Sequence, residues 1–281
     1  MIVLCRILAS LVLCVVVLGG HDAKAQSNGA QSSEPRTVSY TVVQGDTLIE
    51  LAEAYLHRPD DYRAVARLNG VTNPRRLRPG SVLRFPVSLL RTEPARARVS
   101  NVRGAATVQS GGASRALGQG EPLEEGVIIA TGANAFVRLV LPDGSHVALP
   151  SQSRIRIARL RRVLLTGGHD QQFDVLTGRL EAGARRVDPA GRFEIVTPIA
   201  VSAVRGTEFR VSYAAAAGQG STEVLEGSVG VLAQEDALLV QAGQGAAVGV
   251  SGAELAPLPP APRLQDADRP QTGDLIALVP T

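Results

Sequence analysis

The feature that constrains this chain most is an abrupt change from strand to helix at residues 40–48, which read YTVVQGDTL. Residues 39–43 carry the β-branched and aromatic side chains typical of a strand. Thr47 and Glu50 form the capping-box pattern that begins a helix. An apolar stripe at i, i+3, i+4 and i+7 follows, as an amphipathic helix requires: Leu48, Leu51, Ala52 and Tyr55. A strand must therefore turn directly into a helix here.

The next forty residues complete a small module. Pro59 ends the first helix, and Asp60 and Asp61 suit the start of a second helix because acidic side chains favour the helix N-terminus. Gly70 is placed as the residue after that helix. Residues 82–85 then form a second short strand. The predicted order is strand, helix, helix, strand within residues 38–87.

These residues resemble the LysM family. The resemblance rests on YTV at 40–42, GDTL at 45–48, LA at 51–52, LNGV at 68–71, NP at 73–74 and LRPGSVL at 77–83. It implies a βααβ fold that binds N-acetylglucosamine-containing glycans, such as peptidoglycan or chitin, in a shallow groove between two loops. The resemblance places the groove at Gly45, Asp46, Thr47, Leu48, Val71, Asn73, Pro74 and Leu77.

The chemistry of the two loops is compatible with such a groove. A loop that enters a helix offers free backbone N–H groups, and Gly45 permits close backbone approach. Leu48 and Leu77 are candidates to seat an acetamido methyl group. The alternative is structural: Asp46 and Thr47 cap the helix, and Leu48 belongs to the core. Because one copy of the module is present, we expect loose tethering, with about 4 kcal/mol of binding free energy for a millimolar site.

Residues 96–250 have a different sequence pattern, in which short β-rich runs alternate with glycine-containing turns, as in an all-β domain. Residues 136–141 and 146–149 flank an Asp-Gly turn and predict a hairpin. Residues 154–157, 193–197 and 209–211 read as further strands. Residues 222–226 and 229–233 flank Gly227 and predict a second hairpin. A weak repeat leaves a sandwich or a solenoid-like stack open.

This region resembles the FecR periplasmic domain. The match lies in FEIVTP at 193–198, AVRGTEFRV at 203–211 and VLEGSVG at 224–230, with weaker matches between residues 123 and 145. The resemblance implies a periplasmic β domain that binds other proteins. Founding family members carry signals through a membrane helix and a cytoplasmic segment, and this chain shows neither, so the signalling role does not carry over directly.

Two arginine-containing motifs need a decision between function and structure. Arg205-Gly206-Thr207 is interpreted as structural, with Gly206 supplying a bend. A second set of arginines predicts a basic strip: Arg154, Arg156, Arg159, Arg161 and Arg162. A contact with an anionic polymer, lipid headgroups or an acidic protein is one reading. The favoured reading is a charged edge strand that blocks unwanted pairing.

The N-terminus indicates the compartment. Arg6, the apolar run 7–18 and Ala23-Lys24-Ala25 predict a signal peptide, residues 1–25, cleaved after Ala25. An uncleaved anchor is the alternative, but the run is shorter than the ~20 residues of a span. Leu13 before Cys14 argues against a lipoprotein. We expect a periplasmic protein with a flexible linker at 26–37 and a Pro-rich tail at 251–281, whose apolar end at 275–279 docks on a domain or binds a partner.

The sequence favours a binding protein over an enzyme. Both cysteines lie in the leader, so the mature chain has no cysteine nucleophile. No His-x-x-Glu-His run and no Gly-x-Ser-x-Gly elbow occurs, and no cofactor or metal site is predicted. A two-carboxylate wall hydrolase stays open. No glycine loop for phosphate and no basic–aromatic interleaving indicates nucleic acid. The leading hypothesis is a non-enzymatic peptidoglycan binder with a protein partner in the envelope; a regulator that acts through a membrane partner is the alternative.

Overall fold

The computed structural model describes residues 36–185, 187–204, 206–234, 236–249 and 252–257. The predicted signal peptide, almost all of the linker, Arg205 and residues 258–281 of the tail lie outside the described residues. None of the described helices is long and apolar enough to cross a membrane.

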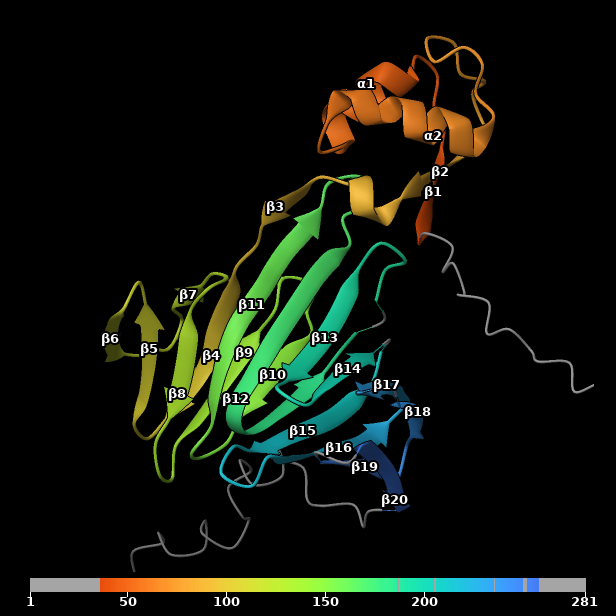
Figure 1. Ribbon diagram of the computed structural model, residues 1–281. Helices are drawn as coiled ribbons and strands as arrows, with labels where there is room; N and C mark the ends of the chain where they lie inside the picture. The colour runs from red at the N-terminus through yellow and green to blue at the C-terminus, as the bar shows by residue number, and fades with distance from the viewer. Residues whose placement is uncertain (1–35, 186, 205, 235, 250–251, 258–281) are drawn as a thin grey trace, which may run out of the picture. The chain divides into compact units, whose positions relative to one another are not determined.

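The first module has the predicted strand–helix–helix–strand order (Figure 1). Its elements are β1 (Thr37–Thr41), α1 (Leu48–Tyr55), the 3₁₀ helix η1 (Pro59–Asp61), α2 (Tyr62–Asn69) and β2 (Val82–Pro86). Strands β1 and β2 pair in antiparallel register, with Thr41 opposite Val82. The βααβ fold expected from the LysM resemblance is confirmed.

Local signals explain where the helices begin and end. The Thr47 side chain caps α1 by accepting a hydrogen bond from the Glu50 N–H at 3.1 Å. Gly70 ends α2 in the left-handed conformation, at φ +64°, where a side chain would be strained. Asp60 and Asp61 lie in η1, so α2 starts slightly later than predicted, at Tyr62. The apolar stripe of α1 packs into a core made mainly of this module's residues: Val38, Val42, Leu48, Leu51, Ala52, Leu56, Val65, Leu83 and Phe85.

The segment between the LysM module and the larger region has secondary structure of its own. It contains η2 (Val87–Leu89) and β3 (Thr92–Pro94). Strand β3 pairs with the C-terminal end of β11 (Arg154–Val163), so the β structure of the larger region begins at Thr92. At the other end, β20 (Gly252–Pro257) continues the pairing past residue 250.

The larger region is built from two sheets that share the long strand β12 (His169–Gly183). Sheet I has the order β6–β5–β8–β11–β12–β13–β14–β17–β18. Its remaining strands are β5 (Ala106–Ser110), β6 (Ala113–Ala116), β8 (Ile128–Thr131), β13 (Arg192–Thr197), β14 (Ala200–Val204), β17 (Ser228–Ala233) and β18 (Asp236–Gln241). Strand β13 runs parallel to β12.

Sheet II has the order β7–β4–β9–β10–β12–β15–β16–β19–β20. Its strands are β4 (Ala97–Arg103), β7 (Pro122–Leu123), β9 (Phe136–Val140), β10 (His146–Leu149), β15 (Glu208–Ala214), β16 (Gln219–Glu226) and β19 (Gln244–Gly249). Strand β12 passes from one sheet to the other near Gly178, at φ +85°. A Cβ there would lie 2.5 Å from the carbonyl oxygen of Gln152, so only glycine fits.

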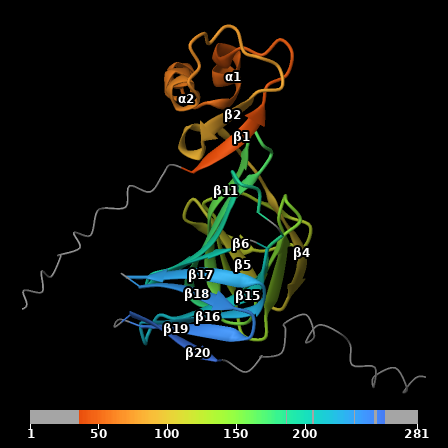
Figure 2. The same ribbon diagram turned by 90° about the vertical axis from the view of Figure 1, so that its right-hand side faces the viewer.

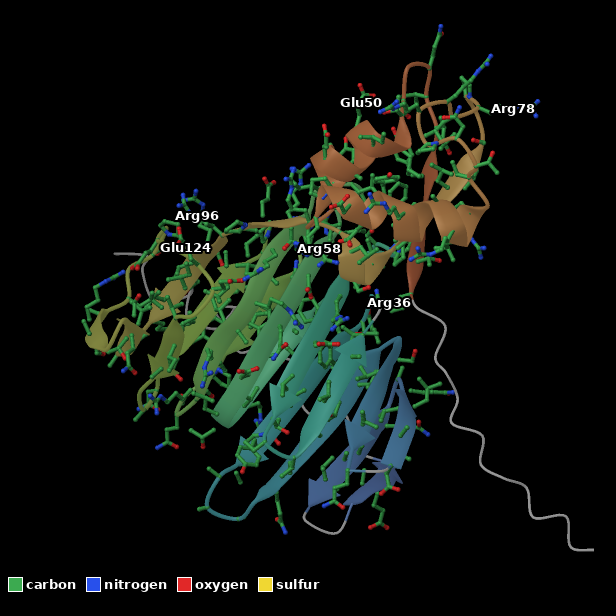
Figure 3. All side chains as sticks on the ribbon, turned by 45° about the horizontal axis from the view of Figure 1, so that its top comes forward. Arg36, Glu50, Arg58, Arg78, Arg96 and Glu124 are labelled. Carbon is green, nitrogen blue, oxygen red and sulfur yellow. The ribbon has the colours of Figure 1, made fainter. Side chains whose placement is uncertain are left out.

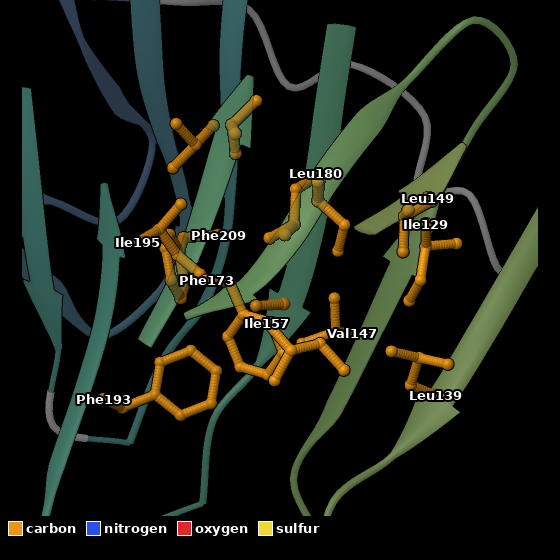
Figure 4. Close-up of a cluster of buried hydrophobic side chains, with 14 of the residues drawn as sticks. Ile129, Leu139, Val147, Leu149, Ile157, Phe173, Leu180, Phe193, Ile195 and Phe209 are labelled. Atoms are coloured by element: carbon orange, nitrogen blue, oxygen red, sulfur yellow. The ribbon is translucent and has the colours of Figure 1, made fainter. Parts of the chain in front are cut away.

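The two sheets enclose one hydrophobic core (Figure 4). Phe173, Phe193 and Phe209 form its aromatic centre, with ring centroids 5.9 and 6.3 Å apart for successive pairs. Aliphatic side chains from both sheets surround them, including Ile157 of β11 and Leu180 of β12. This layered all-β architecture confirms the predicted fold class.

One of the two predicted hairpins forms and the other does not. Strands β9 and β10 pair as expected around the Asp143-Gly144 turn. Strands β16 and β17 belong to different sheets and do not pair with each other, so the second hairpin was wrong. Gly227, at φ +78°, lies where the chain passes from sheet II to sheet I. A Cβ on Gly227 would be only 2.7 Å from the side chain of Thr207.

Candidate functional site

Backbone hydrogen bonds hold together the two loops that the sequence assigned to the groove. The N–H of Leu48, at the start of α1, donates to the carbonyl oxygen of Pro74 at 2.8 Å. The same loops are joined again where Val42 donates to Ser81 at 2.9 Å and accepts from Gly80 at 2.8 Å. Residues 26 to 39 positions apart in sequence therefore form one continuous surface.

Gly45 and Asp46 shape the first loop. Gly45 is exposed at φ +97°, and no atom lies within 4 Å of where its Cβ would be. Oδ2 of Asp46 accepts hydrogen bonds from the Val43 N–H at 2.8 Å and from the Tyr40 hydroxyl at 2.9 Å. Burial, together with this bond to Asp46, raises the pKa of Tyr40 to about 12. Asp46 thus fixes the loop, and the exposed backbone at Gly45 is accessible to a ligand.

Thr47 and Leu48 have structural roles. The Thr47 hydroxyl accepts a hydrogen bond from the Glu50 N–H and donates one to Glu50 Oε2 at 2.8 Å. Its donor and its acceptor are therefore both engaged within the helix cap. The Leu48 side chain is fully buried. The prediction that Leu48 seats a ligand methyl group is therefore corrected: its side chain fills the core, and its N–H positions the second loop.

The second loop offers a mixed surface. Val71 and Leu77 are half-buried, packed against the module's core with one side toward solvent. Asn73 is exposed, and its Oδ1 accepts from the Arg75 N–H at 3.1 Å. Pro74 is half-buried and supplies the carbonyl that joins the loops. The accessible parts of the predicted groove are thus Gly45, Asn73 and the outer sides of Val71, Pro74 and Leu77.

Two exposed valines beside the predicted groove were not singled out from the sequence. Val43 and Val82 are each 57% exposed. Val82 pairs with Thr41, two residues before Val43, so both valines lie next to the loops, where β1 ends and β2 begins. Their signal in the sequence was a β-branched residue at a loop boundary, which is ambiguous because such residues also end ordinary strands. Arg78, labelled in Figure 3, adds an exposed cation on the second loop.

Four of the five arginines in the predicted basic strip on β11 form ion pairs with acidic side chains of β3, β12, β13 and the segment before β8. The ion pairs are Arg156–Asp174 at 4.0 Å, Arg159–Asp170 at 3.2 Å, Arg159–Glu194 at 3.3 Å, Arg161–Glu125 at 2.6 Å and Arg162–Glu93 at 3.0 Å. Arg154 donates to the Gln109 side chain at 3.2 Å. Arg161 and a backbone bond from Leu160 hold the pKa of Glu125 below its ordinary value.

Strand β11 also lies inside sheet I, between β12 on one side and β8 and β3 on the other. The edge-strand interpretation of these arginines was therefore wrong. Alternation along a strand shows which side chains share a face, but not whether the strand is at an edge. Four of the five arginines are thus held in ion pairs, and a contact of the strip with an anionic partner stays a prediction.

Sheet II carries a further charged cluster away from the groove. Arg210 pairs with Glu181 at 2.9 Å, and both side chains are nearly fully buried; Glu223 lies 3.7 Å from the same guanidinium. Burial lowers the pKa of His146 on the neighbouring strand β10. Within the described ranges, no three His, Cys, Asp or Glu side chains are grouped so that they could hold a metal ion.

Comparison with known families agrees with this two-part organisation. The LysM domain model matches residues 40–86, and the FecR protein model matches residues 127–230. The resemblances and their order along the chain are thus confirmed. The first match indicates glycan binding by the small module, and the second lies within the β region.

Solved structures give a more distant likeness. Two crystal structures of a putative anti-sigma factor from Parabacteroides distasonis ATCC 8503, at 2.50 and 1.65 Å resolution, align with 19% sequence identity and a TM-score of 0.38. Each alignment covers 46% of this chain and 57% of that chain. No curated protein matches this chain.

Proposed function

We propose that this chain is a non-enzymatic periplasmic protein that binds peptidoglycan through its LysM module and a protein partner through its FecR-like region. The observation that carries the proposal is the Leu48–Pro74 hydrogen bond of 2.8 Å, which holds two loops as one surface. Fixed loops lower the conformational entropy lost on binding, because the ligand does not have to order them.

The surface suits an N-acetylated sugar. Such a sugar offers an amide N–H, a carbonyl, hydroxyl groups and one methyl. Exposed backbone at Gly45 lets a sugar approach closely, and the amide side chain of Asn73 both donates and accepts hydrogen bonds. With Leu48 buried, the apolar seat for the methyl falls to the outer sides of Val71 and Leu77.

Retention on purified peptidoglycan sacculi tests the groove. Gly45→Trp places a bulky ring over the surface, and Asn73→Ala removes the amide. A matched control is Gly112→Trp, because Gly112 also has a positive φ, at +87°, and open space at its Cβ, but lies in the β5–β6 turn. Both groove variants should bind at least about tenfold more weakly, a loss of about 1.4 kcal/mol. Unchanged retention of both would defeat the groove, and equal loss in the control would show a non-specific effect.

Incubation of the protein with sacculi also tests its non-enzymatic nature. Peptidoglycan hydrolysis releases soluble muropeptides, which chromatography detects. The proposal predicts no release even at high protein concentration. Release that a folded groove variant retains would instead identify a wall hydrolase with a separate active site.

A regulatory role is the second candidate, and the FecR match at residues 127–230 favours it. In this case the β region detects an envelope signal and passes it to a membrane partner. Capture of a membrane protein by the β region, together with a neighbouring sensor or sigma-factor gene, would support regulation. Capture of wall enzymes or wall-anchored proteins would support a tethering role.

A further inference from the structure

The outer face of sheet I is apolar where the sheet ends at β18. Strand register aligns two rows of outward side chains across β13, β14, β17 and β18. The rows are Glu194–Ala203–Gly230–Leu239 and Val196–Val201–Leu232–Ala237. We call the seven uncharged members of these rows the β17–β18 face. In Figure 2, β17 and β18 form one layer, and β16, β19 and β20 form another. The second layer faces the inner side of β17 and β18, so it does not cover the β17–β18 face.

Two leucines protrude from the β17–β18 face. Leu232 is 52% exposed and Leu239 is 60% exposed, while Val231 and Val240 on the same strands are buried in the core. Single exposed leucines are ordinary on protein surfaces. Two of them in a continuous apolar patch at the end of a sheet are typical of a contact surface.

A hollow of about 340 Å³ lies directly beside Leu239, lined in part by Glu194, Ala203 and Gly230. Gly230 does not have the positive φ that would require glycine. A Cβ at this position would meet only the Ala203 carbonyl oxygen, at 3.7 Å, which is ordinary contact. The backbone therefore tolerates a side chain here, and what glycine provides is the empty space.

We propose that the β17–β18 face binds a second copy of this chain, with Leu239 of each copy inserted into the hollow of the other. A protrusion and a hollow side by side on one face are self-complementary under a two-fold axis, which is the geometry of an isologous dimer. Charged side chains of both signs also line the hollow: Arg36, Arg192 and Glu194. Arg192 and Glu194 lie 3.5 Å apart. A two-fold axis can place each charge beside its opposite in the partner copy.

The size of the face sets the strength of the contact. A patch of seven small and medium side chains is below the roughly 1,200 Å² of total buried area that stable complexes need, so the dimer is weak and dissociates on dilution. A dimer presents two LysM modules to one polymer, which raises retention through effective concentration. This consequence rests on the proposed glycan binding, whereas the dimer itself does not.

Sedimentation velocity from low micromolar to near-millimolar concentration tests the dimer without any glycan. Leu239→Ser removes the protrusion. Gly230→Leu and Ala203→Leu each fill the hollow while adding apolar surface. The matched control is Val140→Ser, because Val140 is 42% exposed but lies on β9, in sheet II. The wild type and the control should dimerise with rising concentration, and the other three variants should associate at least tenfold more weakly while keeping the wild-type circular dichroism spectrum.

Three results would overturn the proposal. A wild-type protein that stays monomeric at every concentration has no such dimer. Hollow-filling variants that associate as well as the wild type, or better, would show general stickiness of an apolar surface. Dimerisation only after removal of residues 258–281 would show that this segment, and not a second copy, occupies the face.

Discussion

The buried position of Leu48 gives a quantitative prediction that separates a core role from ligand contact. Truncating a fully buried leucine to alanine costs about 2–5 kcal/mol, because apolar contacts are lost and a cavity remains. A module of about fifty residues has only about 3–7 kcal/mol of stability in total. Leu48→Ala should therefore bring the LysM module close to its unfolding midpoint at room temperature.

Urea denaturation followed by tyrosine fluorescence measures this loss. The chain has no tryptophan and four tyrosines, of which Tyr40, Tyr55 and Tyr62 lie in the LysM module and Tyr213 in the β region. The helical signal in circular dichroism is a second probe, because among the described residues both α-helices belong to this module. A control, Val43→Ala, changes a side chain that is 57% exposed and should alter the free energy of unfolding by less than about 0.5 kcal/mol.

Glycan retention completes the test. In Leu48→Ala, retention should fall only in proportion to the unfolded fraction and should recover on cooling or in stabilising osmolyte. If the variant is as stable as the wild type but has lost glycan binding, Leu48 contacts the ligand directly. That result would refute the assignment of its side chain to the core.

Three further predictions concern stability. Thr47→Ala should destabilise the LysM module by about 1 kcal/mol through loss of the helix cap, measured by the urea midpoint. Arg161 holds the pKa of Glu125 below its ordinary value, so their ion pair stabilises the folded state at any pH above the ordinary carboxylate pKa. This stability is lost as the pH falls through the lowered pKa of Glu125. In Glu125→Gln, acid unfolding of the β region should therefore depend less on pH. Gly178→Ala, with its Cβ 2.5 Å from the Gln152 carbonyl, should cost more than about 2 kcal/mol in thermal unfolding.

Local signals along the sequence were sufficient for the LysM module. The Thr47 cap and the left-handed Gly70 each act over three or four residues, so the pattern alone placed the start of α1 and the end of α2. Leu48 could not be assigned in the same way. A leucine in the first turn of a helix can face the core or a groove, and only the packing of the second loop decides between them.

In the β region the sequence indicated strands but not their partners. Alternating residues located β11 and β13, yet the parallel pairing of β12 with β13 could not be read from the connection between them. Its Asp188-Pro189 pair signals a turn but does not specify which strand the chain pairs with next. Gly227 looked like a hairpin turn because glycine favours both a tight turn and a crossing between sheets. Ion pairs of the β11 arginines depend on such long-range pairing, and so they could not be read from the arginines alone.

Nuclear magnetic resonance mapping with a chitin oligosaccharide tests the central claim most directly. Saturating sugar should shift the backbone amide signals of Gly45 to Thr47 and of Val71 to Leu77, together with the side-chain amide of Asn73, while signals of the β region stay in place. Shifts confined to the β region, or the absence of shifts anywhere at millimolar sugar, would contradict glycan recognition by these two loops.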